Sequence, residues 1–330
     1  MKDFISRSLK TFTTAIALSL LFFTLPSLSE SHKPLKISVI QVIQHPALDA
    51  SRQGIYDELI AQGLQPDKDF IWTYESAQAN AGLASQIAQK AVGNKVDAIV
   101  TLGTMVTQAA LSAAKGEDIP ILFASVTDPV GSEIVDSLER PGGNATGVSN
   151  LTPSEPQFRM FEKIQPGLKR LGIIYSPGEA NSLALNDEMK VSAQKMGIEL
   201  VFAPALKTSD VSSAAMKLVD KVDAFFVNND AIALAAFGSI VQVAESGGKP
   251  VYVSDTDMVE KGGALAALGP NQYELGRQAG KMLVKVLRGA SVADMPVEFA
   301  KGRKVVVNQS VADKLKITLP PVNKLEADGK

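Results

Sequence analysis

Short, nearly continuous apolar runs alternate along this chain with longer stretches in which apolar residues recur every three or four positions. The first pattern is typical of strands covered on both faces, and the second of helices with one buried face. Their regular alternation predicts parallel sheets with helices on both sides. The runs expected to form strands are residues 35–43, 70–74, the centre of 95–104, 119–124, 171–175, 200–203, 224–227, 251–253 and 264–268, then a strand pair within 297–307.

The helices are marked by their ends as well as by their periodicity. Pro46 suits a helix start, and the helix that follows runs to Ala61 before Gly63 stops it. Asn80 is placed to cap the next helix. A long helix near the C-terminus covers residues 273–288 and ends at Gly289.

The pattern occurs twice. Residues 95–104 and 221–230 both begin Lys-Val-Asp-Ala, turn apolar and end in small polar groups. The neighbouring runs repeat in the same order, since 36–40 corresponds to 170–175 and 120–128 to 250–257. This period is far too long for a solenoid. It predicts an α/β protein of two similar, Rossmann-like lobes, each a doubly wound parallel sheet, whose polar strand ends face each other across a cleft.

Composition narrows the possible functions. The chain has 330 residues, of which 45% are hydrophobic and 21% charged, with a formal net charge of −2. This charge gives no reason to expect nucleic acid or an anionic membrane surface as a partner. The sequence contains no cysteine and only two histidines, His32 and His45. Disulfides, thiolate metal sites and a histidine-rich metal site are thereby excluded, although a carboxylate calcium site is not. We expect neither a cofactor nor a metal.

The first thirty residues resemble an export signal. Lys2, Arg7 and Lys10 precede an apolar run over residues 11–25, and small residues surround a cleavage position after Ser29. This three-part pattern predicts a signal peptide over residues 1–29 and a periplasmic mature protein. The alternative is an N-terminal membrane anchor, because the run is close to the shortest length that spans a bilayer.

Candidate ligand-binding residues follow from the fold. Ligands of open α/β sheets bind beyond the carboxyl ends of the strands, where the next helices present free N–H groups. Polar residues in these positions can also simply cap the following helix. The candidates are Gln44, His45, Leu48, Thr104, Met105, Ser125, Thr127, Asp128, Asn181, Ser182, Asn229, Asp230 and Asp255.

The chemistry of this set favours a zwitterion. It contains no cationic side chain, which disfavours a phosphate-rich ligand. Thr104 and Ser182 could hold a carboxylate, and Asp230 or Asp255 could hold an ammonium group. An aromatic ligand would need an apolar slot. That slot could draw on Val42, Leu48, Met105, Phe123 or Phe226, although core packing accounts for such residues equally well.

Catalysis has little support. A Ser-His-Asp relay would have to use His45, yet no Gly-x-Ser-x-Gly elbow precedes a helix. The glycine-rich stretch at residues 142–147 follows no clear strand and opens no helix, so it is not a dinucleotide fingerprint. We therefore expect a protein that is not an enzyme, and a hydrolase using His45 is the enzymatic alternative.

Five ordered motifs identify a resemblance. They are His45-Pro46-Ala47-Leu48-Asp49, residues 123–129 ending Val-Thr-Asp-Pro, residues 139–148 around Pro-Gly-Gly-Asn, Tyr175-Ser176-Pro177-Gly178-Glu179-Ala180-Asn181-Ser182, and Leu275-Gly276-Arg277-Gln278-Ala279-Gly280. Together they are similar to the ABC transporter substrate-binding proteins of the tryptophan/tyrosine (aromatic amino acid) type, from about Leu35 to Pro320. One departure is Val227-Asn228-Asn229-Asp230, where that family often has a Pro-Thr-Asp-like loop.

The resemblance implies a type I periplasmic binding protein in which two lobes joined by a three-segment hinge close on a ligand. It places residues 35–149 and 271–290 in the N-terminal lobe, and residues 150–270 and 296–330 in the C-terminal lobe. It further implies a monomer that delivers an amino acid, tryptophan, tyrosine or phenylalanine, to an inner-membrane ABC permease. The alternatives are the same fold binding a sugar or nucleoside, and a ligand sensor for a membrane receptor.

Overall fold

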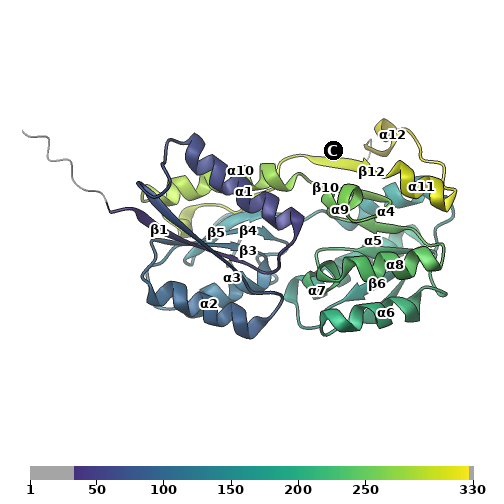
Figure 1. Ribbon diagram of the computed structural model, residues 1–330, viewed down its shortest axis with the longest axis horizontal. Coiled ribbons are helices and arrows are strands. Elements are labelled where there is room, and N and C mark those ends of the chain that lie inside the picture. The colour runs from purple at the N-terminus through teal and green to yellow at the C-terminus, as the bar shows by residue number, and fades with distance from the viewer. Residues whose placement is uncertain (1–32, 327–330) are drawn as a thin grey trace, which may run out of the picture. The chain divides into compact units, whose positions relative to one another are not determined.

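The computed structural model describes residues 33–326, which form one unit containing two six-stranded sheets (Figure 1). The expected signal peptide, its cleavage site and His32 lie outside these residues. Within residues 33–326, no helix is both long and apolar enough to cross a membrane. The α/β class predicted from the sequence is confirmed.

The first sheet has the strand order β11-β5-β4-β3-β1-β2, and the second has the order β12-β10-β9-β8-β6-β7. The strands of the first sheet are β1 Leu35–Gln41, β2 Phe70–Ser76, β3 Ala98–Leu102, β4 Ile121–Val126, β5 Ala145–Ser149 and β11 Glu298–Phe299. Those of the second are β6 Arg170–Tyr175, β7 Glu199–Pro204, β8 Ala224–Val227, β9 Val251–Val253, β10 Ala266–Pro270 and β12 Arg303–Val307.

Helices lie on both faces of each sheet. Those packed on the first sheet are α1 Pro46–Ala61, α2 Ala81–Gly93, α3 Thr104–Ala113 and α10 Gln272–Leu287. The second sheet carries α4 Ser154–Ile164, α5 Ala180–Met196, α6 Val211–Leu218, α7 Ala231–Ala235, α8 Phe237–Ser246, α9 Asp257–Lys261, α11 Gln309–Leu315 and α12 Val322–Glu326. Two short 3₁₀ turns are η1 Thr208–Asp210 and η2 Val292–Asp294.

The internal repeat has a structural counterpart. Strand β3 follows the first Lys-Val-Asp-Ala and β8 follows the second, and each lies between corresponding neighbours in its sheet. Strands β1 and β6 are likewise equivalent, as are β4 and β9. The register agrees, because Ile37 of β1 is level with Ala98 of β3, and Leu171 of β6 is level with Ala224 of β8. The prediction of two similar doubly wound units is confirmed.

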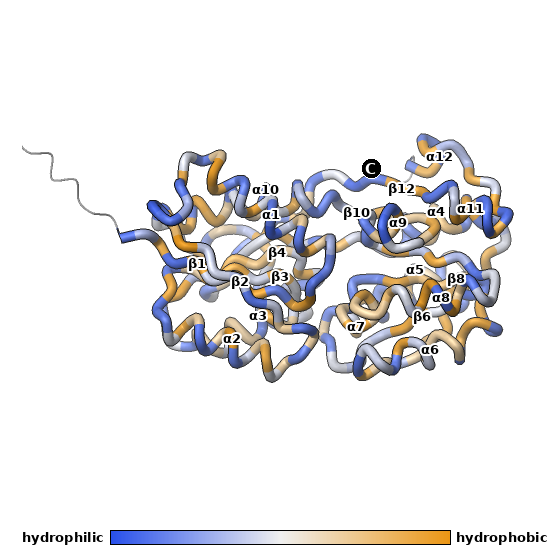
Figure 2. Tube along the Cα trace, viewed as in Figure 1, coloured by the Kyte–Doolittle hydropathy of each residue, from blue (hydrophilic) through white to orange (hydrophobic). Residues whose placement is uncertain are grey.

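The apolar runs form the core layers. In the first sheet, one face packs on α2 and α3 around Ile99 and Phe123, and the other packs on α1 and α10 around Val100 and Leu283. In Figure 2 the tube alternates between hydrophobic and hydrophilic stretches along α2. Only Ala84, Ile87, Ala88 and Ala91 of that helix are buried. Apolar residues recur every three or four positions in the sequence because only this one face of the helix is buried.

Helices α1 and α10 pack with unusually little space between their backbones. A methyl group added at Gly276 would lie 2.0 Å from the carbonyl oxygen of Ser51, and one at Gly54 would lie 2.2 Å from that of Tyr273. The two helices can approach this closely only because both positions lack a Cβ. This contact fixes the start of α10, and with it Gln272, against the first sheet.

Two sequence-based assignments are wrong near the C-terminus. The expected strand pair within 297–307 is not a pair: β11 runs parallel to β5 in the first sheet, whereas β12 is antiparallel to β10 in the second. Residues 298–299 therefore belong with the first lobe and not, as expected, with the second. The chain passes from the first sheet to the second at residues 300–302. The sequence did not show this, because a strand of two residues is too short to have a periodicity that would indicate its partner.

Candidate functional site

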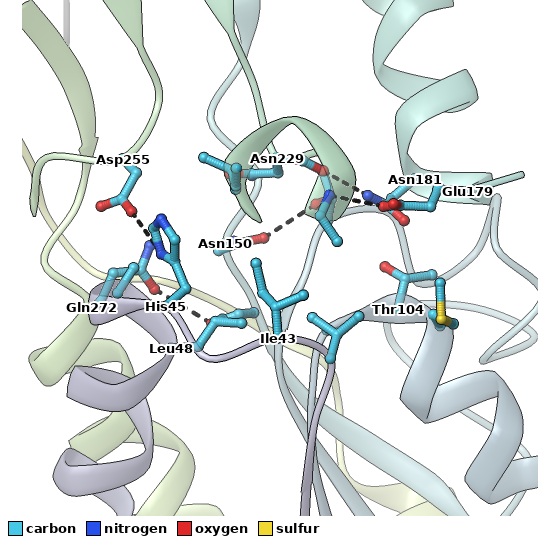
Figure 3. A pocket seen from close by; sticks show the side chains of 18 residues that line it. Ile43, His45, Leu48, Thr104, Asn150, Glu179, Asn181, Asn229, Asp255 and Gln272 are labelled. Atoms are coloured by element: carbon cyan, nitrogen blue, oxygen red, sulfur yellow. Dashed lines mark hydrogen bonds and ion pairs between the residues drawn. The ribbon is translucent and has the colours of Figure 1, made fainter. Parts of the chain in front are cut away.

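A pocket lies where the carboxyl ends of the two sets of strands face each other (Figure 3). The empty space between its lining atoms is about 560 Å³, part of which opens to solvent. The lining residues come from both lobes: Val42, Ile43, His45, Ala47, Leu48, Gly103, Thr104, Met105, Ser125, Thr127, Asn150, Glu179, Asn181, Asn229, Ala231, Leu234, Asp255 and Gln272.

The polar groups of the pocket gather at two ends. Figure 3 shows His45, Asp255 and Gln272 on one side, and Thr104, Glu179 and Asn181 on the other, with Ile43 and Leu48 between them. We refer to these as the His45–Asp255 end and the Thr104–Glu179 end. The middle is largely aliphatic, since Val42, Ile43, Ala47, Leu48, Met105, Ala231 and Leu234 all line the pocket.

At the Thr104–Glu179 end, helix α3 presents its N-terminus. Gly103 precedes the helix with φ 109°, a backbone conformation that disfavours side chains, and a Cβ there would lie 2.7 Å from Val42. Thr104 and Met105 occupy the first turn, whose N–H groups have no acceptor within the helix. Together with the Thr104 hydroxyl and the positive end of the helix dipole, these groups suit an anion such as a carboxylate.

Across the cleft from α3, Glu179 supplies a buried carboxyl group. Its Oε2 accepts from the N–H of Ala231 at 3.0 Å, and its Oε1 from that of Ile232 at 3.3 Å, both in the first turn of α7. Burial, and secondarily the nearby Asp230, raises the pKa of Glu179 to about 8. The side chain of the neighbouring Asn181 donates to the backbone carbonyl oxygen of Asn229 at 2.6 Å, which orients the Asn181 amide.

The His45–Asp255 end joins one side chain from each lobe. Nδ1 of His45 lies 3.4 Å from Oδ2 of Asp255, and the two side chains are only 6% and 5% exposed. Neither Oδ2 of Asp255 nor Nε2 of His45 has a hydrogen-bond partner among the described residues. Burial lowers the pKa of His45 to about 4 and raises that of Asp255 to about 7. Charging either group in the empty pocket is therefore unfavourable.

A rigid hydrogen-bond cluster supports this second end from the first lobe. The Ser51 hydroxyl donates to the carbonyl of Gln272 at 3.1 Å, and Ser125 donates to Oε1 of Gln272 at 3.3 Å. Ser125 has φ 57° and lies at a register shift between β4 and β5. A left-handed serine at such an irregularity is costly, and strained positions of this kind cluster at binding sites.

Nine of the thirteen candidates chosen from the sequence line the pocket: His45, Leu48, Thr104, Met105, Ser125, Thr127, Asn181, Asn229 and Asp255. The other four do not. Gln44 is exposed outside it. Asp128 accepts from the N–H of Gly131 at 2.8 Å and so holds a turn. Ser182 and Asp230 are bonded to each other behind the pocket wall, at 2.7 Å.

Asp230 is the clearest case of a structural role. Its Oδ1 accepts from the N–H of Ala233 at 2.8 Å, which caps α7, and its Oδ2 accepts from the N–H of Ser176 at 2.6 Å as well as from Ser182. Both of its oxygens accept from protein donors, and Asp230 does not line the pocket. Asp230 is therefore not placed to hold a ligand ammonium group, whereas Asp255 lines the pocket and its Oδ2 has no hydrogen-bond partner among the described residues.

Sequence reasoning missed half of the pocket. Val42 was considered only as an apolar slot residue, and Phe123 and Phe226, considered with it, lie in the core. Glu179 stands in one of the quoted motifs, yet nothing in its spacing showed that it faces the cleft. The lining residues absent from the candidate set are Val42, Ile43, Ala47, Gly103, Asn150, Glu179, Ala231, Leu234 and Gln272.

Among the described residues, no group of three or more His, Asp or Glu side chains is placed to hold a metal ion.

Comparison with known proteins agrees with this architecture. Residues 36–328 match the family described as ABC transporter substrate binding protein. A tyrosine-binding protein of Clostridioides difficile is 32% identical over 300 residues, covering 91% of this chain and 85% of that protein. A conserved domain protein of Vibrio cholerae has a crystal structure with a TM-score of 0.86 and 39% identity, covering 90% of this chain and 98% of its own.

Two further solved structures differ in their ligand state. The ABC domain of Streptococcus pneumoniae in complex with L-Trp is 34% identical, with a TM-score of 0.84 over 88% of this chain and 98% of its own. A ligand-free, open substrate binding protein of Clostridium difficile is 32% identical, with a TM-score of 0.66 over 87% and 96%. The pocket between paired sheets and the match over nearly the whole described chain lead to one conclusion: this chain belongs to the ABC transporter substrate binding protein family.

Proposed function

We propose that this protein binds an aromatic amino acid between its lobes and delivers it to an ABC permease. The observation that carries the proposal is the pocket itself, in which an aliphatic slot runs between two polar ends. A mostly apolar pocket with a few convergent polar groups is typical of small-molecule sites. An amino acid with a long apolar side chain matches this layout. Its charged head group, its apolar part and the far end of its side chain follow one another in the same order as the parts of the pocket.

The α-carboxylate and the α-ammonium of an amino acid share one carbon, so one end of the pocket must bind both. The Thr104–Glu179 end offers the N–H groups of α3 and the Thr104 hydroxyl for the carboxylate, and the Glu179 carboxyl group for the ammonium. The other end is less suited to a carboxylate, because α1 begins with Pro46, which has no N–H to donate. We therefore assign the amino acid head group to the Thr104–Glu179 end.

This assignment revises the expectation formed from the sequence. Thr104 keeps its role, but the ammonium partner becomes Glu179 in place of Asp230 or Asp255. Burial keeps Glu179 protonated at neutral pH in the empty pocket, and an ammonium group beside it favours the ionised form. Binding would then release a proton from Glu179 to the solvent.

The lobes already touch across the pocket, which supports a closed state. Besides the His45–Asp255 contact, Ala231 and Leu234 of α7 pack into the apolar cluster of the first lobe that contains Ile43. The structure resembles the L-Trp complex more closely than the ligand-free, open structure, with TM-scores of 0.84 and 0.66 at nearly equal identity. In the proposed cycle, ligand selects this closed form, and the permease accepts it. The signal peptide expected at residues 1–29 would place the cycle in the periplasm.

The experiment is a thermal-shift screen of the mature protein against the twenty L-amino acids and a panel of sugars and nucleosides. A ligand that binds only the folded state raises the melting temperature by mass action. We expect shifts with aromatic amino acids and none with sugars. The Glu179→Gln variant should lose most of the shift, whereas Glu188→Gln, within the helix α5 that Glu179 precedes and outside the pocket, should retain it. A shift with a sugar and none with any amino acid would replace this proposal.

A further inference from the structure

The head group assigned above leaves the other polar end without a role. Two buried polar atoms at that end, Nε2 of His45 and Oδ2 of Asp255, have no hydrogen-bond partner among the described residues. Both side chains line the pocket, and both are more than nine-tenths buried. A buried polar atom without a partner is costly, so such atoms in a binding pocket indicate a missing ligand group.

The two atoms differ in what they require. Burial favours a protonated Asp255 carboxyl group, whose Oδ2 can direct its proton at Nδ1 of His45 and still accept a hydrogen bond. Neutral His45 then carries its own proton on Nε2, which can donate a hydrogen bond. A hydroxyl group is both a donor and an acceptor. One hydroxyl placed between them would satisfy both atoms at once.

Resting on the function proposed above, we propose that His45 and Asp255 recognise the phenol hydroxyl of tyrosine and so make the protein selective for tyrosine over phenylalanine. With the head group at the Thr104–Glu179 end, the aromatic ring lies along Ile43 and Leu48, and its hydroxyl reaches the His45–Asp255 end. The hydroxyl donates to Oδ2 of Asp255 and accepts from Nε2 of His45.

The same geometry ranks the other aromatic amino acids. The indole N–H of tryptophan is a donor only, so it can satisfy Asp255 but leaves His45 unpaired. Phenylalanine has neither function and would bury both atoms without partners. Sites built to bond a substrate hydroxyl discriminate strongly against the analogue that lacks it, because the site's own polar groups then remain unpaired.

His45 and Asp255 come from different lobes, since His45 precedes α1 and Asp255 follows β9. Opening the cleft separates them, and closure brings them together. The preference for a ligand hydroxyl therefore arises only when the lobes close, which is the last step of binding. The Ser125 hydroxyl donates to Oε1 of Gln272 at 3.3 Å, and this bond orients the Gln272 side chain in the neighbouring wall of the pocket.

Isothermal titration calorimetry of the mature protein with L-tyrosine, L-tryptophan and L-phenylalanine tests the proposal. We expect tyrosine to bind at least about 30-fold more tightly than phenylalanine, the effect of leaving two buried polar groups unpaired. In Asp255→Leu this ratio should fall towards one, mainly through loss of tyrosine affinity. In the double variant His45→Phe with Asp255→Leu, phenylalanine should bind at least as tightly as tyrosine.

Two variants serve as controls. Glu260→Gln removes an exposed carboxylate from α9, close in sequence to Asp255, and should leave both affinities unchanged. Glu179→Gln removes the proposed head-group partner and should weaken both ligands by a similar factor, so that the ratio is kept.

The outcomes separate the two proposals. Equal affinities for tyrosine and phenylalanine in the unmodified protein would overturn hydroxyl recognition and leave aromatic amino acid binding intact. So would an Asp255→Leu variant that loses both ligands equally, because Asp255 would then hold the head group. Absence of binding by any of the three amino acids would instead overturn the function on which this inference rests.

Discussion

Replacing Asp230 with alanine should destabilise the protein without weakening the ligand contacts. Asp230 is only 4% exposed, and it accepts from the N–H groups of Ser176 and Ala233 and from the hydroxyl of Ser182. Loss of the α7 cap costs about 1 kcal/mol. Leaving a second buried N–H without a partner adds about 1–3 kcal/mol. The sum, about 2–4 kcal/mol, corresponds to a fall in melting temperature of roughly 3–7 °C for a chain of this size.

The matched control is Asn80→Ala, which removes a cap of the same kind, to the N–H of Leu83, from an exposed helix start. It should lower the free energy of unfolding by about 1 kcal/mol. Any larger loss in Asp230→Ala then measures the contribution of the buried hydrogen bonds of Asp230. Melting curves followed by circular dichroism give both values, and calorimetry below the melting range gives the ligand affinity. A variant with an unchanged melting temperature and a lost ligand would refute this reasoning and return Asp230 to the role of ammonium partner.

Three further predictions concern packing, pH and fluorescence. Gly276→Ala should lower the melting temperature by about 2–5 °C because its Cβ would lie 2.0 Å from the Ser51 carbonyl oxygen. Gly93→Ala, with open space around it, should be neutral or slightly stabilising. From pH 6.5 to 8 the ligand-free protein should lose stability. In this range burial holds the pKa of Glu179 at about 8 and that of Asp255 at about 7, both above their unfolded values, so the folded state binds more protons than the unfolded state and stability falls as they leave. Glu179→Gln should reduce the slope of the melting temperature against pH, with the Asp255 contribution remaining, and an equal slope would contradict this account. Trp72, the single tryptophan, packs on Tyr56 away from the pocket, so its emission spectrum should stay unchanged when tyrosine binds, and a large shift would place the ligand elsewhere.

The fold could be read from the sequence where burial is uniform. Strands such as 98–102 and 224–227 are covered on both faces, so every position is buried and nearly all are apolar. The duplication followed from the same cause, because equivalent strands require equivalent runs. The two-residue strand at 298–299 carried no such signal, since its place in the first sheet depends on pairing with β5.

The site was harder to predict because residues of one type in one kind of position take different roles. Asp230 and Asp255 both follow a buried strand, yet Asp230 caps a helix and Asp255 keeps an oxygen free. Only the three-dimensional arrangement shows which donors reach each carboxylate. Glu179 faces the cleft because the N–H groups of α7, about fifty residues further along the chain, orient it. No local pattern around Glu179 contains that information.

A crystal structure of the mature protein with L-tyrosine is the measurement that bears most directly on the account. The account predicts the ligand between the two sheets, its carboxylate at Thr104 and the start of α3, its ammonium group beside Glu179, and its hydroxyl between His45 and Asp255. Tyrosine in the reverse orientation, with its ammonium group on Asp255, would contradict the assignment of the two ends. Tyrosine outside the cleft would contradict the account as a whole.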